Sequence, residues 1–403
     1  MRSDAVGKKE QEIDRNFYNR EDISTCVPNK KSVRGDRKAR YILQRTLTRT
    51  FHLFMEEYSE IPIGKTSFIK LKPKNVLIQS KARWNQCLCE VCTNVDLKLK
   101  RLNIELRSAG FQIITDRYCL SDETICKDSS VACIDRKCPK CGVHAIDKKM
   151  EDFLTANGLK QLSWKQWGQV EYAPKKKRVC LQTKTGSLKE LVTCLKSELD
   201  SLPCHLFEAH RQQKQFATVS QSPPPFTVVT VMDFAENFTC TMQSEVQSAH
   251  WYQQQVTLHP SVSYYPCHDS ECTNEKPVRE AVHIVSSDTK HDVHAVAKFT
   301  EVISEHIKQR DPTLKNMIQL SDGCAGQYKS RVAFADLSFA SSDLPFEQVQ
   351  QNYFGSCHSK NPCDGEGGVV KNAATRAIKS GTAVISDSDK NLSKEAKVKE
   401  ILP

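Results

Sequence analysis

The sequence predicts a mixed α/β fold, in which a five-stranded mixed sheet with flanking helices follows a helical, zinc-binding N-terminal region. Three observations lead to this prediction. Apolar, β-branched segments recur between residues 226 and 354, with helical periodicity between them. Closely spaced cysteines gather between residues 87 and 141, and the formal net charge is +10. A chain of 403 residues has room for two or three domains.

The composition limits the classes of protein that the chain can belong to. It has no apolar run of membrane-spanning length, and its first residues lack the apolar core of a secretory signal. We therefore expect a cytosolic or nuclear protein. Disulfides are rare in such reducing compartments, so the 18 cysteines favour metal binding. The positive charge fits a polyanionic partner such as double-stranded DNA, although charge alone is weak evidence.

The N-terminal part is strongly basic. We expect residues 1–30 to be disordered, because they are polar and show no periodicity. Apolar residues at helical spacing predict one long amphipathic helix over 37–58, followed by a short helix over 65–71. Residues 31–83 thus resemble a helix-turn-helix reader, or else form a basic solvated helix that packs on its neighbour. The candidate DNA-binding residues are Arg37, Lys38, Arg40 and Arg45.

Residues 84–144 are predicted to bind zinc in a structural role. Zinc takes four tetrahedral thiolate or imidazole ligands, and each Cys-x-x-Cys pair supplies two of them. Our first choice pairs Cys89 and Cys92 with Cys138 and Cys141. A set of buried free thiols is the alternative. The substitutes, or ligands of a second ion, are Cys87, Cys119, Cys126, Cys133 and His144.

Residues 145–221 are predicted to be helical and to end in a proline-rich linker, which places the main domain boundary near residue 222. Trp164 and Trp167, three positions apart, are expected on one face of a helix in the core. A basic run in this region resembles a nuclear localisation signal, although such a run is often only a solvated loop. The run consists of Lys175, Lys176, Lys177 and Arg178.

Residues 222–380 show the succession β-β-β-α-β-α-β-α, which is the order of a ribonuclease H-like (RNase H-like) fold, and residues 381–403 are expected to form a polar tail. The strands are predicted over 226–233, 255–265, 281–287, 317–320 and 346–354, with helices over 291–308, 331–340 and from 364 onward. Asp288 is a candidate helix cap.

Acids stand at three places of this succession. Asp233 ends the first strand, Asp322 follows the fourth, and Asp364 or Glu366 opens the last helix. Each acid alone is better explained as a cap, a turn or a strand end. Together they favour a site for two hard cations, Mg²⁺ or Mn²⁺, which phosphodiester chemistry uses to neutralise the attacking and leaving oxygens. Lys329 and Arg331, close to Asp322, are candidate phosphate contacts.

At several segments the chain resembles transposon-derived metazoan proteins with a DDE/DDD-type transposase core of unassigned superfamily. The segments are MDFAENFTC, QSAHWYQQQVTLHP, SDGCAGQYKS and NYFGSCHSKNPCDGEGGVVK, with CLCEVCTN and CPKCGV upstream, so the likeness covers roughly residues 60–380. It implies catalytic roles for Asp233, Asp322 and Asp364. Many relatives have Glu as the third acid, which keeps Glu366 as an alternative. Cys357 interrupts the family's usual Gly-His pair.

The resemblance implies a nuclear transposase that cleaves and transfers DNA strands, with transposon ends as its DNA partner and other copies of itself on that DNA. A domesticated, catalytically inactive zinc protein that only binds DNA is the first alternative, and a plain nuclease of the RNase H type is the second. The acids favour an enzyme over a binding protein. The zinc-binding and basic N-terminal part favours a transposase over a plain nuclease.

Overall fold

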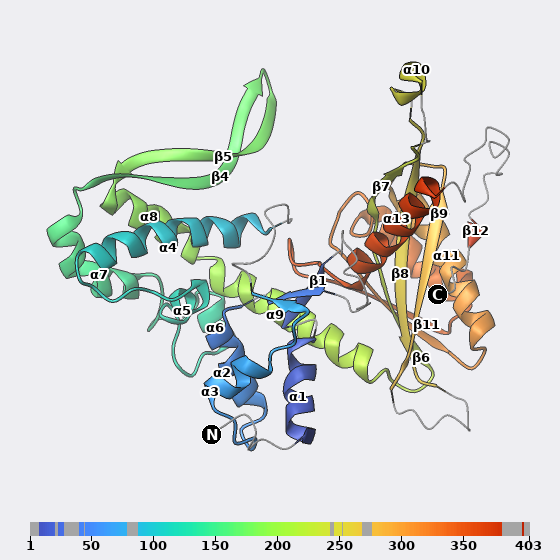
Figure 1. Ribbon diagram of the computed structural model, residues 1–403, viewed down its shortest axis with the longest axis horizontal. Helices are drawn as coiled ribbons and strands as arrows, with labels where there is room; N and C mark the ends of the chain where they lie inside the picture. Colours follow the sequence, from blue (N-terminus) through green and yellow to red (C-terminus); the bar gives the residue numbers. More distant parts are fainter. Residues whose placement is uncertain are drawn as a thin grey trace. The chain divides into compact units, whose positions relative to one another are not determined.

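The computed structural model (Figure 1) describes residues 8–20, 23–27, 40–43, 45–78, 88–241, 246–251, 253–267, 276–380 and 397–398. The chain divides into two compact units. The larger unit combines Met1–Ala82 with Gln212–Pro403, and the smaller unit is Arg83–Arg211. No helix of the described residues is long and apolar enough to cross a membrane.

A mixed sheet forms the centre of the larger unit. Its strands lie in the order β11-β10-β6-β8-β9-β12, with β7 beside β8. Strand β10 is parallel to both β6 and β11, whereas β8 is antiparallel to β6 and β9. The bounds are β6 Thr227–Met232, β7 Ala235–Thr239, β8 Gln255–Tyr265, β9 Val278–Ser286, β10 Asn316–Ser321, β11 Gln348–Tyr353 and β12 Lys397–Val398.

Helices cover both faces of this sheet. The core on one face joins Val228 of β6 to Phe299 and Ile303 of α11 (Val293–Arg310). The core on the other face joins Val229 of β6 to Cys363 of α13 (Pro362–Lys379). Successive residues of a strand point to opposite faces, so the apolar segment that forms β6 is buried throughout. The predicted mixed α/β sheet with flanking helices is confirmed.

The remaining helices of this part are short or exposed, and some details differ from the prediction. Helix α12 is Arg331–Asp343 and α10 is Gln247–His250. Asp292 rather than Asp288 caps α11, because its side chain accepts a hydrogen bond from the backbone N–H of Ala295. Strand β7 was not predicted, since it is only five residues long and follows β6 almost directly.

The N-terminal segment of the larger unit differs from the prediction. Its elements are α1 Lys8–Tyr18, β1 Ser24–Val27, β2 Arg40–Leu43, α2 Leu47–Glu57, α3 Lys65–Leu71 and β3 Val76–Leu77. The prediction of one helix over 37–58 is wrong, because β2 pairs with β1 and β3, and Thr46 caps the N-terminus of α2. Disorder over 1–30 is also wrong for α1, whose Phe17 packs on Phe54 and Phe68. The short helix over 65–71 is confirmed.

The smaller unit is helical apart from one long hairpin. Its elements are α4 Glu90–Ser108, α5 Arg117–Asp122, α6 Val131–Ile134, α7 His144–Asn157, β4 Gln161–Ala173, β5 Lys176–Ser187, α8 Leu188–Leu199 and the start of α9, Leu202–Gln221. The helical prediction for residues 145–221 is therefore wrong over β4 and β5. Positions three apart face opposite sides of a strand, so Trp164 is buried while Trp167 is 38% exposed.

Candidate functional site

The three predicted aspartates lie at the ends of adjacent elements in the larger unit. Asp233 follows β6 directly, and Asp322 follows β10, the parallel neighbour of β6. Because neighbouring parallel strands end at the same edge of a sheet, the two acids emerge at one edge. Asp364 is in the first turn of α13, where its carboxylate accepts a hydrogen bond from the backbone N–H of Asn361 over 3.1 Å.

The acids influence one another electrostatically. The pKa of Asp233 is raised to about 7, first by burial and then by the negative charges of Asp322 and Asp364. Burial also raises the pKa of Asp364. A half-buried carboxyl whose ionisation is disfavoured by burial and by two neighbouring acids is typical of sites that hold protons or cations.

Asn361 completes the cluster and was not predicted. This buried residue caps α13, and its side-chain amide donates a hydrogen bond to Oδ2 of Asp233 over 3.3 Å. That bond opposes the rise in the pKa of Asp233. The sequence did contain a signal, because Asn361 and Asp364 have the spacing of a capping box, with proline at the first helical position between them.

Glu366, the alternative third acid, has other partners. Its carboxylate pairs with the guanidinium of Arg279 over 2.8 Å and lies 3.6 Å from the imidazole of His283. Both partners are on β9. Among the acids, Asp322 and Asp364 contribute to the pKa shift of Asp233, and Glu366 does not. Asp364 is therefore the better candidate for the third acid.

An aromatic and imidazole group borders the acids and was also not predicted. The phenol of Tyr328 is 3.1 Å from Nε2 of His259, and both side chains are buried. Burial lowers the pKa of His259 to about 3, so this imidazole stays neutral at physiological pH. The pKa of Tyr328 is raised by burial and then by the charges of Asp233 and Asp322, so its hydroxyl stays protonated.

A group of four cysteines in the smaller unit could hold a metal such as zinc. The sulfur atoms of Cys126, Cys133, Cys138 and Cys141 lie within 4.8 Å of one another. Those of Cys126 and Cys138 are 3.9 Å apart, and a tetrahedral zinc–thiolate site would place them about 3.8 Å apart. Hydrogen bonds from Ser130 lower the pKa of Cys133 to about 6, whereas those with the neighbouring thiols raise the pKa of Cys126 to about 12.

A second group lies in the same unit and corrects the predicted ligand set. Cys89 and Cys92, at the start of α4, gather with His205 of α9, whose Nε2 is 3.2 Å from the sulfur of Cys89. The hydrogen bond with Cys89 lowers the pKa of Cys92 to about 7, which favours the thiolate. The pairing of Cys89 and Cys92 with Cys138 and Cys141 is therefore wrong. His205 was missed because 112 residues separate it from Cys92 in the chain.

The other predicted residues are distributed as follows. His144 is not part of either group, and Cys87 lies outside the described residues. Arg37 and Lys38 also lie outside them, as does the side chain of Arg40. Arg45 is only 8% exposed, so it is a poor phosphate contact. Lys329 and Arg331 are exposed, close to Asp322 in the chain. The basic run, Lys175 to Arg178, is exposed at the turn of the β4–β5 hairpin.

Comparisons with known proteins divide the chain in a similar way. Three family models match, and each is described as a domain of unknown function: DUF8699 over residues 7–80, DUF8700 over 90–203 and DUF8701 over 212–399. No curated protein matches the chain, and no solved structure matches it. The acid cluster lies within the third matched region, and the two cysteine groups lie within the second, apart from Cys89 and His205.

Proposed function

We propose that the protein cleaves and transfers strands of double-stranded DNA by metal-dependent phosphodiester chemistry, as transposases do. The observation that carries the proposal is the acid cluster. Asp233 and Asp322 follow adjacent parallel strands, and Asp364 is close enough to raise the pKa of Asp233. No isolated role as a cap, turn or strand end explains why three acids from distant segments share one place.

The succession of elements supports an RNase H-like domain. From β6 through α13 the elements follow the expected order β-β-β-α-β-α-β-α, with β7 and α10 added between the first two strands. In such domains this order brings together the first strand, the fourth strand and the last helix, which carry the acids. Fold alone does not establish function, so the proposal depends on the acids rather than on the sheet.

The donor set fits Mg²⁺ or Mn²⁺. Carboxylate oxygens are hard ligands. The pKa of Asp233 is raised first by burial and then by the charges of Asp322 and Asp364, and a divalent cation would offset that negative charge. Asp233, Asp322 and Asp364 would hold it. Such ions supply activation of the attacking oxygen and stabilisation of the leaving oxygen in phosphodiester chemistry.

Other side chains of this site hold the acids in place. Asn361 orients Asp233 through a hydrogen bond, and its backbone N–H orients Asp364. Tyr328 and His259 form a buried, uncharged boundary beside them. Glu366 neutralises Arg279 instead of joining the acids. Exposed Lys329 and Arg331 would contact the DNA backbone next to the reacting phosphate.

The remaining features fit a nuclear DNA-processing protein. The two cysteine groups would bind structural zinc and stabilise the smaller unit. The exposed basic run fits a nuclear import signal. We expect more than one copy of the chain to act together on a pair of transposon ends, because each end must be cut and joined.

The test is cleavage of a duplex that carries the sequences flanking the protein's own gene, with Mg²⁺ or Mn²⁺ as the only added cation. Asp233→Asn, Asp322→Asn and Asp364→Asn should each abolish nicking and strand transfer. Glu366→Gln is the matched control and should keep most of the activity. Cleavage that survives all three aspartate substitutions would contradict the proposal.

A domesticated DNA-binding protein without catalysis is the second candidate. It is favoured by the two cysteine groups and by the exposed cations, since neither feature depends on the acids. Zinc-dependent binding of the same duplex without nicking, under every divalent cation tried, would support it over the enzyme.

A further inference from the structure

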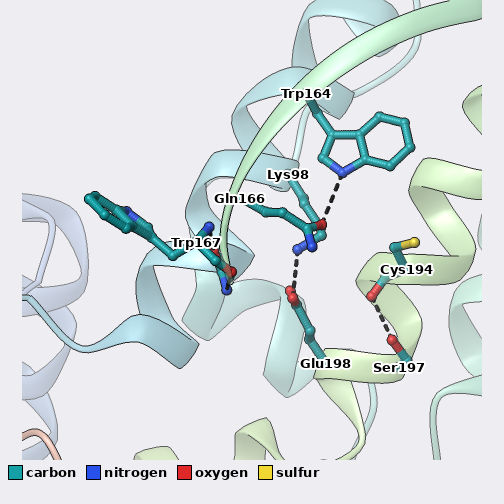
Figure 2. A network of polar contacts seen from close by, with 8 residues as sticks. Lys98, Trp164, Gln166, Trp167, Cys194, Ser197 and Glu198 are labelled. Atoms are coloured by element: carbon teal, nitrogen blue, oxygen red, sulfur yellow. Dashed lines mark hydrogen bonds and ion pairs between the residues drawn. The ribbon is translucent and has the colours of Figure 1, made fainter. Parts of the chain in front are cut away.

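The β4–β5 hairpin of the smaller unit is firmly anchored at its base. The side-chain amide of Asn94 on α4 donates to the carbonyl of Trp167 over 2.9 Å and accepts from its N–H over 2.7 Å. Trp164 is buried, and its indole N–H donates to Gln166 (Figure 2). The pair between Lys98 and Glu198 joins α4 to α8 beside this anchor.

Beyond this anchor, the hairpin extends as a ribbon of two strands. Figure 1 shows it leaving α4 and α8, with its turn pointing away from both helices. From Gln169 to Thr185 every residue is exposed or only half-buried. Two-stranded ribbons are marginally stable in water without a third strand or a helix against one face. A ribbon of this length is therefore suited to become ordered against a partner.

The charge of the ribbon indicates the chemistry of that partner. Between residues 161 and 187 there are six cations and one acid, Glu171. The cations are Lys165, Lys175, Lys176, Lys177, Arg178 and Lys184. All six are exposed, and Glu171 is engaged with the turn because its carboxylate accepts a hydrogen bond from the N–H of Lys175 over 3.1 Å. The charge is complementary to a polyanion.

One face of the ribbon also carries a small apolar patch among polar residues. Trp167 is paired with Leu181 across the strands, and Val179 follows at the next position of that face. These side chains are 38%, 44% and 49% exposed, respectively. Lys165 and Lys177 lie on the same face, before and after the apolar residues. On the opposite face the guanidinium of Arg178 is 5.6 Å from the ring centre of Tyr172.

We propose that the β4–β5 hairpin is a DNA-binding arm that enters a groove of duplex DNA. The major groove admits a two-stranded β-ribbon, and lysines at the edges would neutralise phosphates on either side. The apolar patch would contact base edges or sugars inside the groove. The choice of DNA rests on the proposed function, whereas the assignment of a polyanion rests on the hairpin alone.

The turn of the hairpin contributes to this arrangement. Pro174 is followed by Lys175 in the left-handed conformation, with φ of 62°. A two-residue turn of this kind favours glycine or asparagine at the second position, so lysine there is strained. Glycine at this position would give a more stable turn but no charge. The lysine puts a cation at the tip of the ribbon at the cost of this strain.

The experiment measures binding of the zinc-loaded full chain to a fluorescently labelled duplex of mixed sequence, by anisotropy over a series of salt concentrations. In the test variant, Lys175, Lys176 and Lys177 are changed to Gln. In the control variant, three exposed lysines of the same unit but outside the hairpin, Lys100, Lys148 and Lys189, are changed to Gln. Trp167→Ala tests the apolar patch separately.

The hairpin variant should bind at least tenfold more weakly. Its affinity should also depend less on salt: the negative slope of log affinity against log salt should become shallower by up to about 2.7, because each phosphate contact contributes about 0.9. The control variant should keep most of the affinity and most of the salt dependence of the wild type. Equal effects in the two variants, or none in the hairpin variant, would overturn the proposal. Preference for an acidic peptide over the duplex would also overturn it.

The outcome separates this inference from the proposed function. Hairpin-dependent binding without nicking would refute only the proposed catalysis. Nicking that depends on Asp233 but not on the hairpin lysines would refute only the proposed DNA-binding arm. Binding to purified DNA also distinguishes the arm from a nuclear import signal, since import factors are absent from the measurement.

Discussion

The side-chain amide of Asn361 donates a hydrogen bond to Oδ2 of Asp233 and so connects the N-cap of α13 to the end of β6. The amide oxygen of the same side chain accepts from the backbone N–H of Cys363 over 2.8 Å. A hydrogen bond to the ionised form of a carboxyl favours that form, so Asn361 opposes the effect of burial on the pKa of Asp233. One residue thus contributes to the helix start and to the charge state of the acid cluster.

Asn361→Ser separates these two contributions. Serine is also a good N-cap residue, but it lacks the amide that donates to Asp233. We expect the pKa of Asp233 to rise further above about 7, which carbon NMR of the carboxyl group measures in metal-free protein. Ser330→Ala, which removes the N-cap of α12, is the control. It should cost about 1 kcal/mol of stability and leave the pKa of Asp233 unchanged. An unaltered pKa in Asn361→Ser would refute the role given to the amide.

The raised pKa of Asp233 predicts a dependence of stability on pH. The pKa is about 7 in the folded protein and 3.8 ordinarily, so between these values the folded state binds more protons than the unfolded state. The free energy of unfolding therefore falls as pH rises through this interval. Asp322→Asn removes one like charge, so the pKa of Asp233 should decrease. The free energy of unfolding should then fall less over this pH interval than in the wild type.

The measurement is the melting temperature at pH 5 and pH 8 without divalent cations. Asp14 also has a pKa raised to about 7 by burial, so it adds to the pH dependence of stability over the same interval. The variant is therefore compared with the wild type, in which the contribution of Asp14 is the same. Asp152→Asn, at an exposed position on α7, is the control and should retain the wild-type difference. If Asp322→Asn loses as much stability at pH 8 as the wild type, the coupling of these two acids is wrong.

The sheet and the acids could be predicted because their physical signals are local. A run such as that of β6 is apolar and β-branched on both faces, which indicates a strand covered on both sides. The acid that ends the run then has a defined place at the edge of the sheet. Asp233 and Asp322 were found in this way and Asp364 from its place at the start of the last helix, and the charges of Asp322 and Asp364 raise the pKa of Asp233.

The hairpin and the metal ligands could not be predicted because their signals are not local. Exposed ribbons carry no continuous apolar face, so β4 and β5 gave only two tryptophans at a spacing that also suits a helix. His205 joins Cys89 and Cys92 only after α9 has returned to the start of α4. Spacing in the sequence favours nearby cysteines and gives no weight to a distant histidine.

The separation of the cysteines into two groups predicts two independent zinc ions per chain. Cys138→Ser should remove the ion of the four-cysteine group, and Cys92→Ser should remove the ion held with His205. Each loss is measured as zinc per chain by mass spectrometry of the metal. Cys180→Ser, in the hairpin and outside both groups, is the control and should lose none. If either single substitution removes all the zinc, the division into two sites is wrong.

The ion pair between Lys98 and Glu198 leads to a prediction about the smaller unit. The side chain of Lys98 is 1% exposed, and its ammonium is 2.5 Å from Oε1 of Glu198. Burial raises the pKa of Glu198, and its Oε2 has no hydrogen-bond partner among the described residues. The ammonium of Lys98 is thus fully desolvated, the carboxylate of Glu198 is partly so, and the pair is incompletely satisfied.

Glu198→Gln leaves the ammonium of Lys98 buried without a counter-charge, so it should destabilise the smaller unit by about 3 kcal/mol. The double variant Lys98→Met with Glu198→Leu removes both charges and fills a similar volume, so its stability should be close to that of the wild type. Urea unfolding followed by tryptophan fluorescence measures both, since Trp164 is buried beside the pair. Equal destabilisation by the single and double variants would show that the pair is a net source of stability. In that case the base of the hairpin would depend on the charge pair itself rather than on packing between α4 and α8.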